Sequence, residues 1–274
     1  MERGAMARIP RFSVSQITTI GRAFEADLAA FVAAGVPAVG VSIHKLERCG
    51  VAYGLRLLRD SGLPVSCFTS AGPVPLDDEA AAAPALARVR EHLAAAAEAG
   101  AASLILLPGA TRGLAWEEAC ARARPLVASL LAEAERLGVR IAIEPVSQLR
   151  MDLCFLHSFD EALDFIAPLA SPHVGVVLEL NNAWIERGLA GNIRRRTTDI
   201  ALVQVSDFAI GTQRTSERVM IGDGDIPLRR WCGALAAARY DGWWDIELLG
   251  PAIETIGYDA VVPQAMERFR ELWA

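Results

Sequence analysis

A short apolar run followed by a longer stretch with helical spacing recurs eight times along the chain, and this repeat constrains the fold more than any other feature. The apolar runs have the length and the branched residues typical of buried strands. They cover residues 11–17, 38–43, 64–69, 102–107, 140–144, 174–180, 201–206 and 243–248. The stretches between them repeat apolar residues every three or four positions, as amphipathic helices do. They cover residues 22–34, 49–61, 79–99, 115–137, 158–168, 185–196, 227–239 and 258–273.

Eight strand–helix units without a linker or a break in composition predict a closed (β/α)₈ TIM barrel, formed as a single domain over residues 1–274. The alternative is an open, doubly wound sheet, which would require a glycine-rich phosphate turn after its first strand. The corresponding segment, "QITTIGRAF", lacks the G-x-G-x-x-G pattern. A chain of 274 residues that is 53% apolar can bury the core of such a barrel.

Charge and cysteine content restrict the compartment and the partners. A net charge of −6 argues against nucleic acids and acidic membrane surfaces as main partners. The five cysteines are widely spaced without a C-x-x-C pair, which favours a reducing interior over a disulfide framework or a zinc knuckle. The segment "MERGAMARIPRF" lacks the apolar centre of a secretory signal, and no uncharged apolar stretch reaches the roughly 18 residues of a membrane span. We therefore expect a cytoplasmic protein without a membrane partner.

Glutamates close three of the predicted strands. Glu144 ends the run 140–144, Glu179 ends "VGVVLE" and Glu247 ends "WWDIE". Gln204 lies within the seventh strand, and Asp207 follows at its rim. The carboxyl ends of TIM-barrel strands meet at one mouth, where the chemistry of such barrels takes place. We therefore expect the three glutamates and Gln204 to converge on one site.

Three carboxylates within a few ångströms of one another cannot all stay ionised without a cation. Carboxylate and amide oxygens suit a hard or borderline divalent ion such as Mn²⁺, Mg²⁺ or Co²⁺. Three carboxylates around such an ion leave a charge of about −1, which favours a neutral polyol or keto-sugar over a free dianion as substrate. The competing interpretation is that each glutamate pairs with an arginine, because arginines are abundant in this chain.

Five segments of the chain carry a resemblance to a known family. In chain order they are "IAIEP", "VGVVLELNNAW", "LVQVSD", "RVMIGDGDIP" and "YDGWWDIEL". Their order and content resemble the xylose isomerase-like TIM barrels. This superfamily includes sugar-phosphate isomerases and epimerases, hydroxypyruvate isomerase, ketohexose 3-epimerases, inosose dehydratase and endonuclease IV. The resemblance extends from about residue 11 to residue 273 and is most specific from residue 140 onwards.

The resemblance implies a single divalent metal ion held by Glu144, Glu179, Gln204 and Glu247. Mn²⁺ is the first expectation for this ion, and Mg²⁺ and Co²⁺ are the alternatives. Two of the positions depart from the family pattern. Glu179 stands where aspartate is usual, so its carboxylate reaches one methylene further. Gln204 replaces the usual histidine, as in hydroxypyruvate isomerase-like members, and an amide oxygen is a weaker ligand.

The resemblance also implies a catalytic role for Glu144 and Glu247. In the epimerases that the chain resembles, two such glutamates flank the reacting carbon of the substrate. One removes the proton next to the carbonyl, the metal stabilises the enediolate, and the other glutamate returns a proton. The implied function is an isomerase or epimerase of a keto-sugar or related polyol. The alternative is a lyase that uses the same enediolate, such as a keto-inositol or dehydroshikimate-type dehydratase, or a deglycosylase of 3-keto-glycosides.

Three residues are candidate substrate contacts. Arg218 corresponds to an arginine that such proteins place over the site to hold substrate oxygens, although a loop salt bridge with Asp207 or Asp223 would equally explain it. Asn182 stands where many epimerases have a histidine that contacts the substrate. His44 lies at the predicted mouth of the second strand, where it can contact substrate or remain a hydrogen-bonded residue of the rim.

Three further residues have a functional and a structural interpretation. His157, in the loop after the fifth strand, can contact ligand or be structural. Trp184 can form a wall of the pocket or pack on the barrel. Arg150 can bind an acidic group or stay solvated.

Two other classes of function remain open. A DNA-repair enzyme similar to endonuclease IV would need several zinc-binding histidines, and only four histidines occur, none at the expected ligand positions. A non-catalytic barrel that binds a sugar or a protein chain is compatible with Asn182 and Gln204. The resemblance also raises the expectation of a homo-oligomer, since members of the family often associate through their outer helices.

Overall fold

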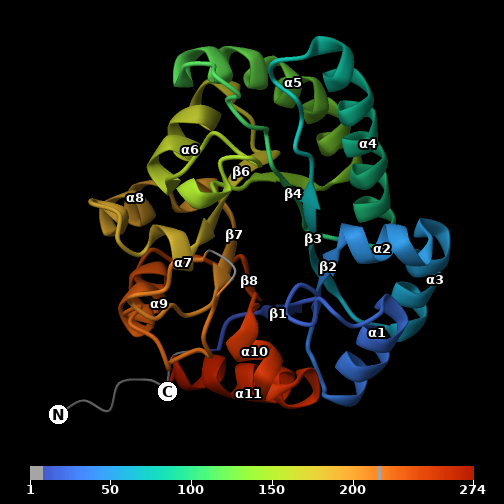
Figure 1. Ribbon diagram of the computed structural model, residues 1–274, viewed down its shortest axis with the longest axis vertical. Coiled ribbons are helices and arrows are strands. Elements are labelled where there is room, and N and C mark those ends of the chain that lie inside the picture. Colours follow the sequence, from blue (N-terminus) through green and yellow to red (C-terminus); the bar gives the residue numbers. More distant parts are fainter. Residues whose placement is uncertain (1–8, 215–216) are drawn as a thin grey trace.

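The computed structural model describes residues 9–214 and 217–274, and the expectation about a secretory signal falls mostly on residues 1–8, outside the described residues. The described residues form a closed barrel of eight parallel strands inside a ring of helices (Figure 1). The strands follow one another around the barrel in chain order. They are β1 (Phe12–Ser15), β2 (Val39–Ser42), β3 (Val65–Ala71), β4 (Ser103–Leu106), β5 (Arg140–Ile143), β6 (Val174–Glu179), β7 (Ile200–Val205) and β8 (Trp243–Ile246).

The first strand closes the barrel by pairing on both sides. Val14 of β1 lies opposite Val39 of β2 on one side and opposite Ile246 of β8 on the other. The predicted TIM barrel is therefore confirmed, and the alternative of an open sheet is wrong. Each of the eight predicted strands overlaps an observed one, because a strand buried on both faces must be apolar along its whole length.

The helices largely follow the predicted stretches. They are α1 (Phe24–Ala33), α2 (Ile43–Cys49), α3 (Val51–Ser61), α4 (Glu79–Glu98), α5 (Trp116–Leu137), α6 (Phe159–Ile166), α7 (Leu180–Ala183), α8 (Leu189–Arg196), α9 (Leu228–Ala237), α10 (Pro251–Ile256) and α11 (Tyr258–Glu271), with short 3₁₀ turns at Gln148–Arg150, Ala167–Leu169 and Thr197–Asp199.

Two differences from the predicted helices have local causes. The helix expected from residue 185 begins only at Leu189, because Gly188 has a φ of 88°, outside the range of a right-handed helix. An additional helix, α2, precedes the one expected from residue 49, and Ser42 caps it by accepting a hydrogen bond from the Lys45 amide at 3.4 Å.

Helix α6 begins with a capping box. The Ser158 hydroxyl accepts a hydrogen bond from the Glu161 amide at 3.1 Å, and the Glu161 carboxylate accepts one from the Ser158 amide at 3.1 Å.

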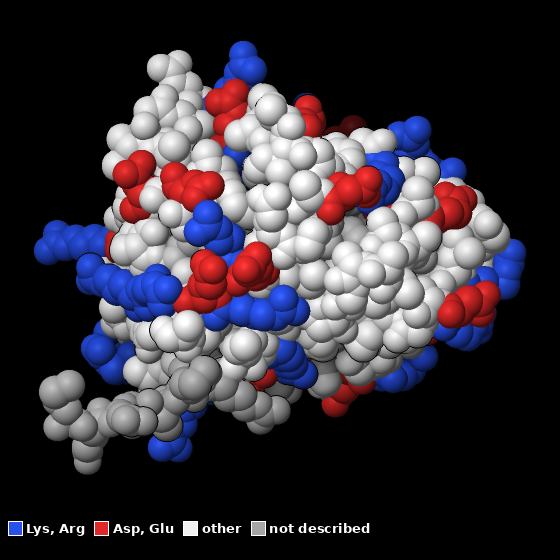
Figure 2. All heavy atoms as spheres, turned by 90° about the horizontal axis from the view of Figure 1, so that it is seen from below, with Lys and Arg blue, Asp and Glu red and all other residues white. Residues whose placement is uncertain are grey.

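Most of the apolar core lies between the strands and the helices. A second, smaller cluster takes one buried residue from each of five neighbouring strands, β3 to β7, and so forms a layer across the barrel. Its members are Cys67, Ile105, Ala142, Val177 and Leu202. None of the described helices is both long and apolar enough to cross a bilayer. Acidic and basic side chains are interspersed over the face shown in Figure 2.

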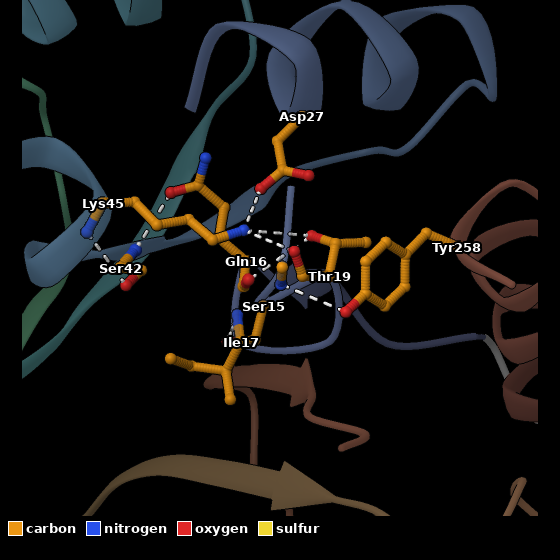
Figure 3. A network of polar contacts seen from close by, with 9 residues as sticks. Ser15, Gln16, Ile17, Thr19, Asp27, Ser42, Lys45 and Tyr258 are labelled. Atoms are coloured by element: carbon orange, nitrogen blue, oxygen red, sulfur yellow. Dashed lines mark hydrogen bonds and ion pairs between the residues drawn. The ribbon is translucent and has the colours of Figure 1, made fainter. Parts of the chain in front are cut away.

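A buried polar network fixes the loops that follow β1 and β2 (Figure 3). Lys45, the single lysine of the chain, forms an ion pair with Asp27 and donates a hydrogen bond to the Thr19 carbonyl at 2.7 Å. Gln16 accepts a hydrogen bond from the Ser42 amide at 3.0 Å. Both Lys45 and Asp27 are buried, so the pair connects α2 to α1.

Candidate active site

The carboxyl ends of β5, β6 and β8 each deliver a glutamate to the same mouth of the barrel. Glu144 follows β5 directly, Glu179 is the last residue of β6, and Glu247 follows β8. The Glu144 amide donates to the Leu106 carbonyl at 3.2 Å, and the Glu247 amide donates to the Val205 carbonyl at 3.0 Å. These backbone hydrogen bonds to neighbouring strands fix the positions of the Glu144 and Glu247 main chain, from which both side chains extend. All three glutamates line one cavity of about 160 Å³.

Glu179 is engaged by two side chains. The Arg218 guanidinium forms an ion pair with one of its carboxylate oxygens, and the Asn182 amide donates to the other. Arg218 is held in place by its backbone amide, which donates to the Leu249 carbonyl at 2.9 Å. The side chains of Glu179 and Arg218 are only 5% and 7% exposed, so each charge depends on the other for compensation.

Gln204 lies directly below the mouth, paired in register with Glu179 across the sheet. Its side-chain amide donates to the Glu247 carboxylate at 2.9 Å. Its Oε1 atom is buried and has no hydrogen-bond partner among the described residues. A buried acceptor without a partner costs free energy, so a donor or cation that contacted this oxygen would stabilise the folded protein.

Burial and mutual repulsion raise the pKa of two of these glutamates. Burial raises the pKa of Glu144 well above its usual value, and the neighbouring charges of Glu247 and Glu179 raise it further, while Arg218 opposes the shift. Burial, followed by the charge of Glu179, raises the pKa of Glu247 to about 8. Raised pKa values of this kind are typical of carboxyl groups that transfer protons.

A further carboxylate lies inside the barrel below this cavity. Asp245 of β8 is fully buried and accepts a hydrogen bond from the Ser13 hydroxyl at 2.5 Å. Burial raises the pKa of Asp245 to about 7. The sequence interpretation missed this residue, although the two-residue period of a strand places Asp245 and Glu247 on the same face of β8.

The other sequence candidates fall into three groups. Asn182, Arg218 and Arg150 line the carboxylate cavity with the glutamates. His157 and Trp184 line a second, neighbouring cavity. His44 is exposed at the start of α2 and lines a separate cavity on the outside of the barrel, so the structure does not bring it to the glutamates.

Asp207 organises the loop after β7 rather than the cavity. It is fully buried, and its carboxylate accepts hydrogen bonds from the backbone amides of Gly222 at 2.9 Å, Gly224 at 3.2 Å and Ile226 at 3.2 Å. The loop salt bridge considered for Arg218 with Asp207 or Asp223 is replaced by the ion pair with Glu179, and Asp223 lies 3.5 Å from Arg268.

A metal ion can be tested against these residues. Within the described part of the chain, no three or more histidine, cysteine, aspartate or glutamate side chains are grouped so that they could hold a metal ion as they stand. The set of donors nevertheless has the required chemistry. Glu144 and Glu247 repel one another, and the Gln204 Oε1 atom has no hydrogen-bond partner within the part of the chain that the structure describes. A divalent cation bound by these groups would relieve both costs, so the chemistry of the donors, though not their present spacing, fits such an ion.

Fold and site together define a TIM barrel with acidic residues at the mouth. The family model described as "Xylose isomerase-like TIM barrel" matches residues 28–272, and the chain belongs to this family. No protein with a curated function matches the sequence significantly.

Solved structures share the fold at low sequence identity. The protein SMc04130 from Sinorhizobium meliloti 1021 superposes with a TM-score of 0.89 at 24% identity, covering 97% of this chain and 99% of its own. The IOLI protein "with a binding zinc atom" gives a TM-score of 0.85 at 18% identity, covering 96% and 98%. A D-allulose 3-epimerase from Methylomonas sp. gives 0.75 at 18% identity, covering 97% and 100%.

Proposed function

We propose that the protein is a divalent-metal-dependent isomerase or epimerase that acts on a keto-sugar or related polyol by moving a proton next to a carbonyl. One observation carries this proposal: Glu144 and Glu247 line the same small cavity, where burial and neighbouring negative charge raise the pKa of each carboxyl above its usual value. Two acids that can both hold and release a proton beside one substrate carbon are what a proton shift requires.

The residues that would hold the cation are Glu144, Glu179 and Glu247, which line the cavity, and Gln204, whose side chain contacts Glu247. Glu179 also forms the ion pair with Arg218. Mn²⁺ is our first choice for the ion, with Mg²⁺ and Co²⁺ as alternatives, because all of the donors are oxygens. When bound, such an ion polarises a carbonyl and offsets the negative charge that develops on its oxygen.

Residues of the chain carry out proton transfer and substrate binding. Glu144 or Glu247 removes the proton next to the carbonyl, and the other returns a proton to the substrate. Asn182 and Arg218 line the cavity and also hold Glu179, so we assign them to substrate oxygens and to the orientation of that carboxylate. Because Arg218 neutralises one of the three glutamates, the mouth suits an uncharged polyol better than a phosphate ester.

The test begins with elemental analysis of the purified protein, followed by a screen of keto-polyols in D₂O with the identified metal restored. The proposal expects deuterium to enter the substrate or product next to the carbonyl without loss of water. Release of water with the absorbance of an enone would instead identify the lyase alternative. Absence of exchange with every polyol, in protein loaded with metal, would refute proton transfer at this site.

A further inference from the structure

A larger cavity of about 510 Å³ adjoins the carboxylate cavity at the mouth of the barrel. The two cavities share Ser147 and Asn182, so they lie side by side. The volume lies within the range of about 300–1,000 Å³ that is usual for small-molecule sites. The carboxylate cavity, at about 160 Å³, accommodates only part of a substrate of that size.

Apolar and aromatic side chains form part of the wall of the larger cavity, beside polar ones that include Glu186 and Arg214. Trp184 and Phe208 are partly buried against the core and line it. Leu149 and Ile185 also line it, and they are 66% and 73% exposed. Large apolar side chains on two different loops that both face one cavity favour an apolar ligand, because such a ligand removes their surface from water. Aromatic walls favour a flat ring.

The His157 ring supplies a hydrogen-bond acceptor to the same cavity. Its Nδ1 lies 3.0 Å from the Val146 carbonyl oxygen, which can only accept, so Nδ1 carries the proton and Nε2 of the neutral ring is an acceptor. A ligand here therefore needs a hydrogen-bond donor as well as an apolar body.

We propose that the larger cavity binds a flat phenolic group, and that the substrate has two parts: a hydroxylated part beside the glutamates and a phenolic part between the loops that follow β5, β6 and β7. The ring lies against Trp184 and Phe208, and its hydroxyl donates to Nε2 of His157. The inference rests on the proposed function for the hydroxylated part. The phenolic site itself needs neither metal nor turnover.

The test is a binding titration of the full chain with umbelliferone, a fluorescent bicyclic phenol. Binding is followed by fluorescence anisotropy at neutral pH, where most of the phenol keeps its proton. Saturable binding is expected, weakened about tenfold by Trp184→Ala, since a ring contact of this kind is worth about one factor of ten. Ile185→Ser should weaken binding in the same direction, and it protects the test if Trp184→Ala does not fold. Val32→Ser, on the outer surface of α1, is the matched control and should bind as the wild type does.

The donor is tested with herniarin, the methyl ether of umbelliferone, which keeps the ring and lacks the hydroxyl. The wild type should bind herniarin more weakly than umbelliferone, and His157→Phe should reduce that difference. Absence of saturable binding, or equal binding by the wild type and by both cavity variants, would overturn the inference. Deuterium exchange with plain keto-sugars and no umbelliferone binding would support the proposed function and refute the phenolic site. Umbelliferone binding as expected, without any deuterium exchange, would refute the proposed function and support the phenolic site.

Discussion

Replacing Arg218 by methionine tests whether its ion pair with Glu179 maintains the acidic mouth. Methionine is similar in length and apolar, so the change removes the guanidinium and leaves the space filled. Glu179 would then remain 5% exposed beside Glu144 and Glu247 without its cation. Breaking a buried ion pair by removing one partner costs about 3–5 kcal/mol, because the remaining charge is buried without compensation.

The expected effect is large enough to measure by thermal unfolding. At about 2–3 °C per kcal/mol for a chain of this size, Arg218→Met should lower Tm by about 6–15 °C. The measurement is made with a chelator present, since a divalent cation could replace part of the missing positive charge. The double variant Arg218→Met/Glu179→Leu should recover most of the loss, because neither buried charge remains.

Arg268→Met is the matched control. Arg268 lies 3.5 Å from Asp223, and its side chain is 47% exposed, so solvent screens the pair. Such a surface pair contributes about 0–1 kcal/mol, and this variant should unfold within about 3 °C of the wild type. If Arg218→Met lowered Tm no more than Arg268→Met does, the claim that Arg218 compensates the buried glutamates would be wrong.

Three further predictions follow from the same geometry. Glu144→Gln and Glu247→Gln should each slow deuterium exchange into the substrate by about 10²–10⁴-fold without lowering Tm. Mass spectrometry measures the exchange and calorimetry measures Tm. Unchanged exchange would favour the non-catalytic barrel. Burial raises the pKa of Glu186 from 4.5 to about 7, so the folded state binds a proton at this carboxyl more tightly than the unfolded state does. The free energy of unfolding therefore falls as the pH rises from 4.5 to about 7. Glu186→Gln should make the decline of Tm over this pH range less steep and leave Tm unchanged below it. Lys45→Met should destabilise the fold by about 3–5 kcal/mol in denaturant titrations, and Lys45→Met/Asp27→Leu should recover most of it; equal losses in both would show that the pair does not act as a unit.

The barrel could be predicted because each strand–helix unit leaves a recognisable pattern of apolar residues in the sequence. Each strand must be apolar along its length, and the glutamates at 144, 179 and 247 stand out as charges at the end of such runs. Barrel closure then brings these ends to one mouth without any need to know the side-chain contacts. Sequence reasoning could therefore place the glutamates around one cavity from strand order alone.

The contacts within the site were not predictable in the same way. Arg218 lies 39 positions from Glu179 in the chain, and the sequence offered Asp207 and Asp223 as nearer partners. The geometry of the loop after β7 determines which acid Arg218 pairs with, because the Asp207 carboxylate accepts hydrogen bonds from the backbone amides of residues 222, 224 and 226. The apolar cavity beside the mouth was also missed, since Leu149 and Ile185 belong to different loops and share no periodic pattern.

Asp245 connects the interior of the barrel with the chemistry of its mouth. A Cβ atom on Gly40 would lie 2.6 Å from an oxygen of this carboxylate, so the glycine of β2 makes room for the buried acid. Asp245 adds to the rise in the pKa of Glu247, after burial and Glu179. Without a cation, the raised pKa values of Glu247 and Asp245 make the negative charge of this region at neutral pH smaller than its number of carboxyl groups. A divalent ion must displace protons from the carboxyl groups that bind it, so its affinity should rise with pH.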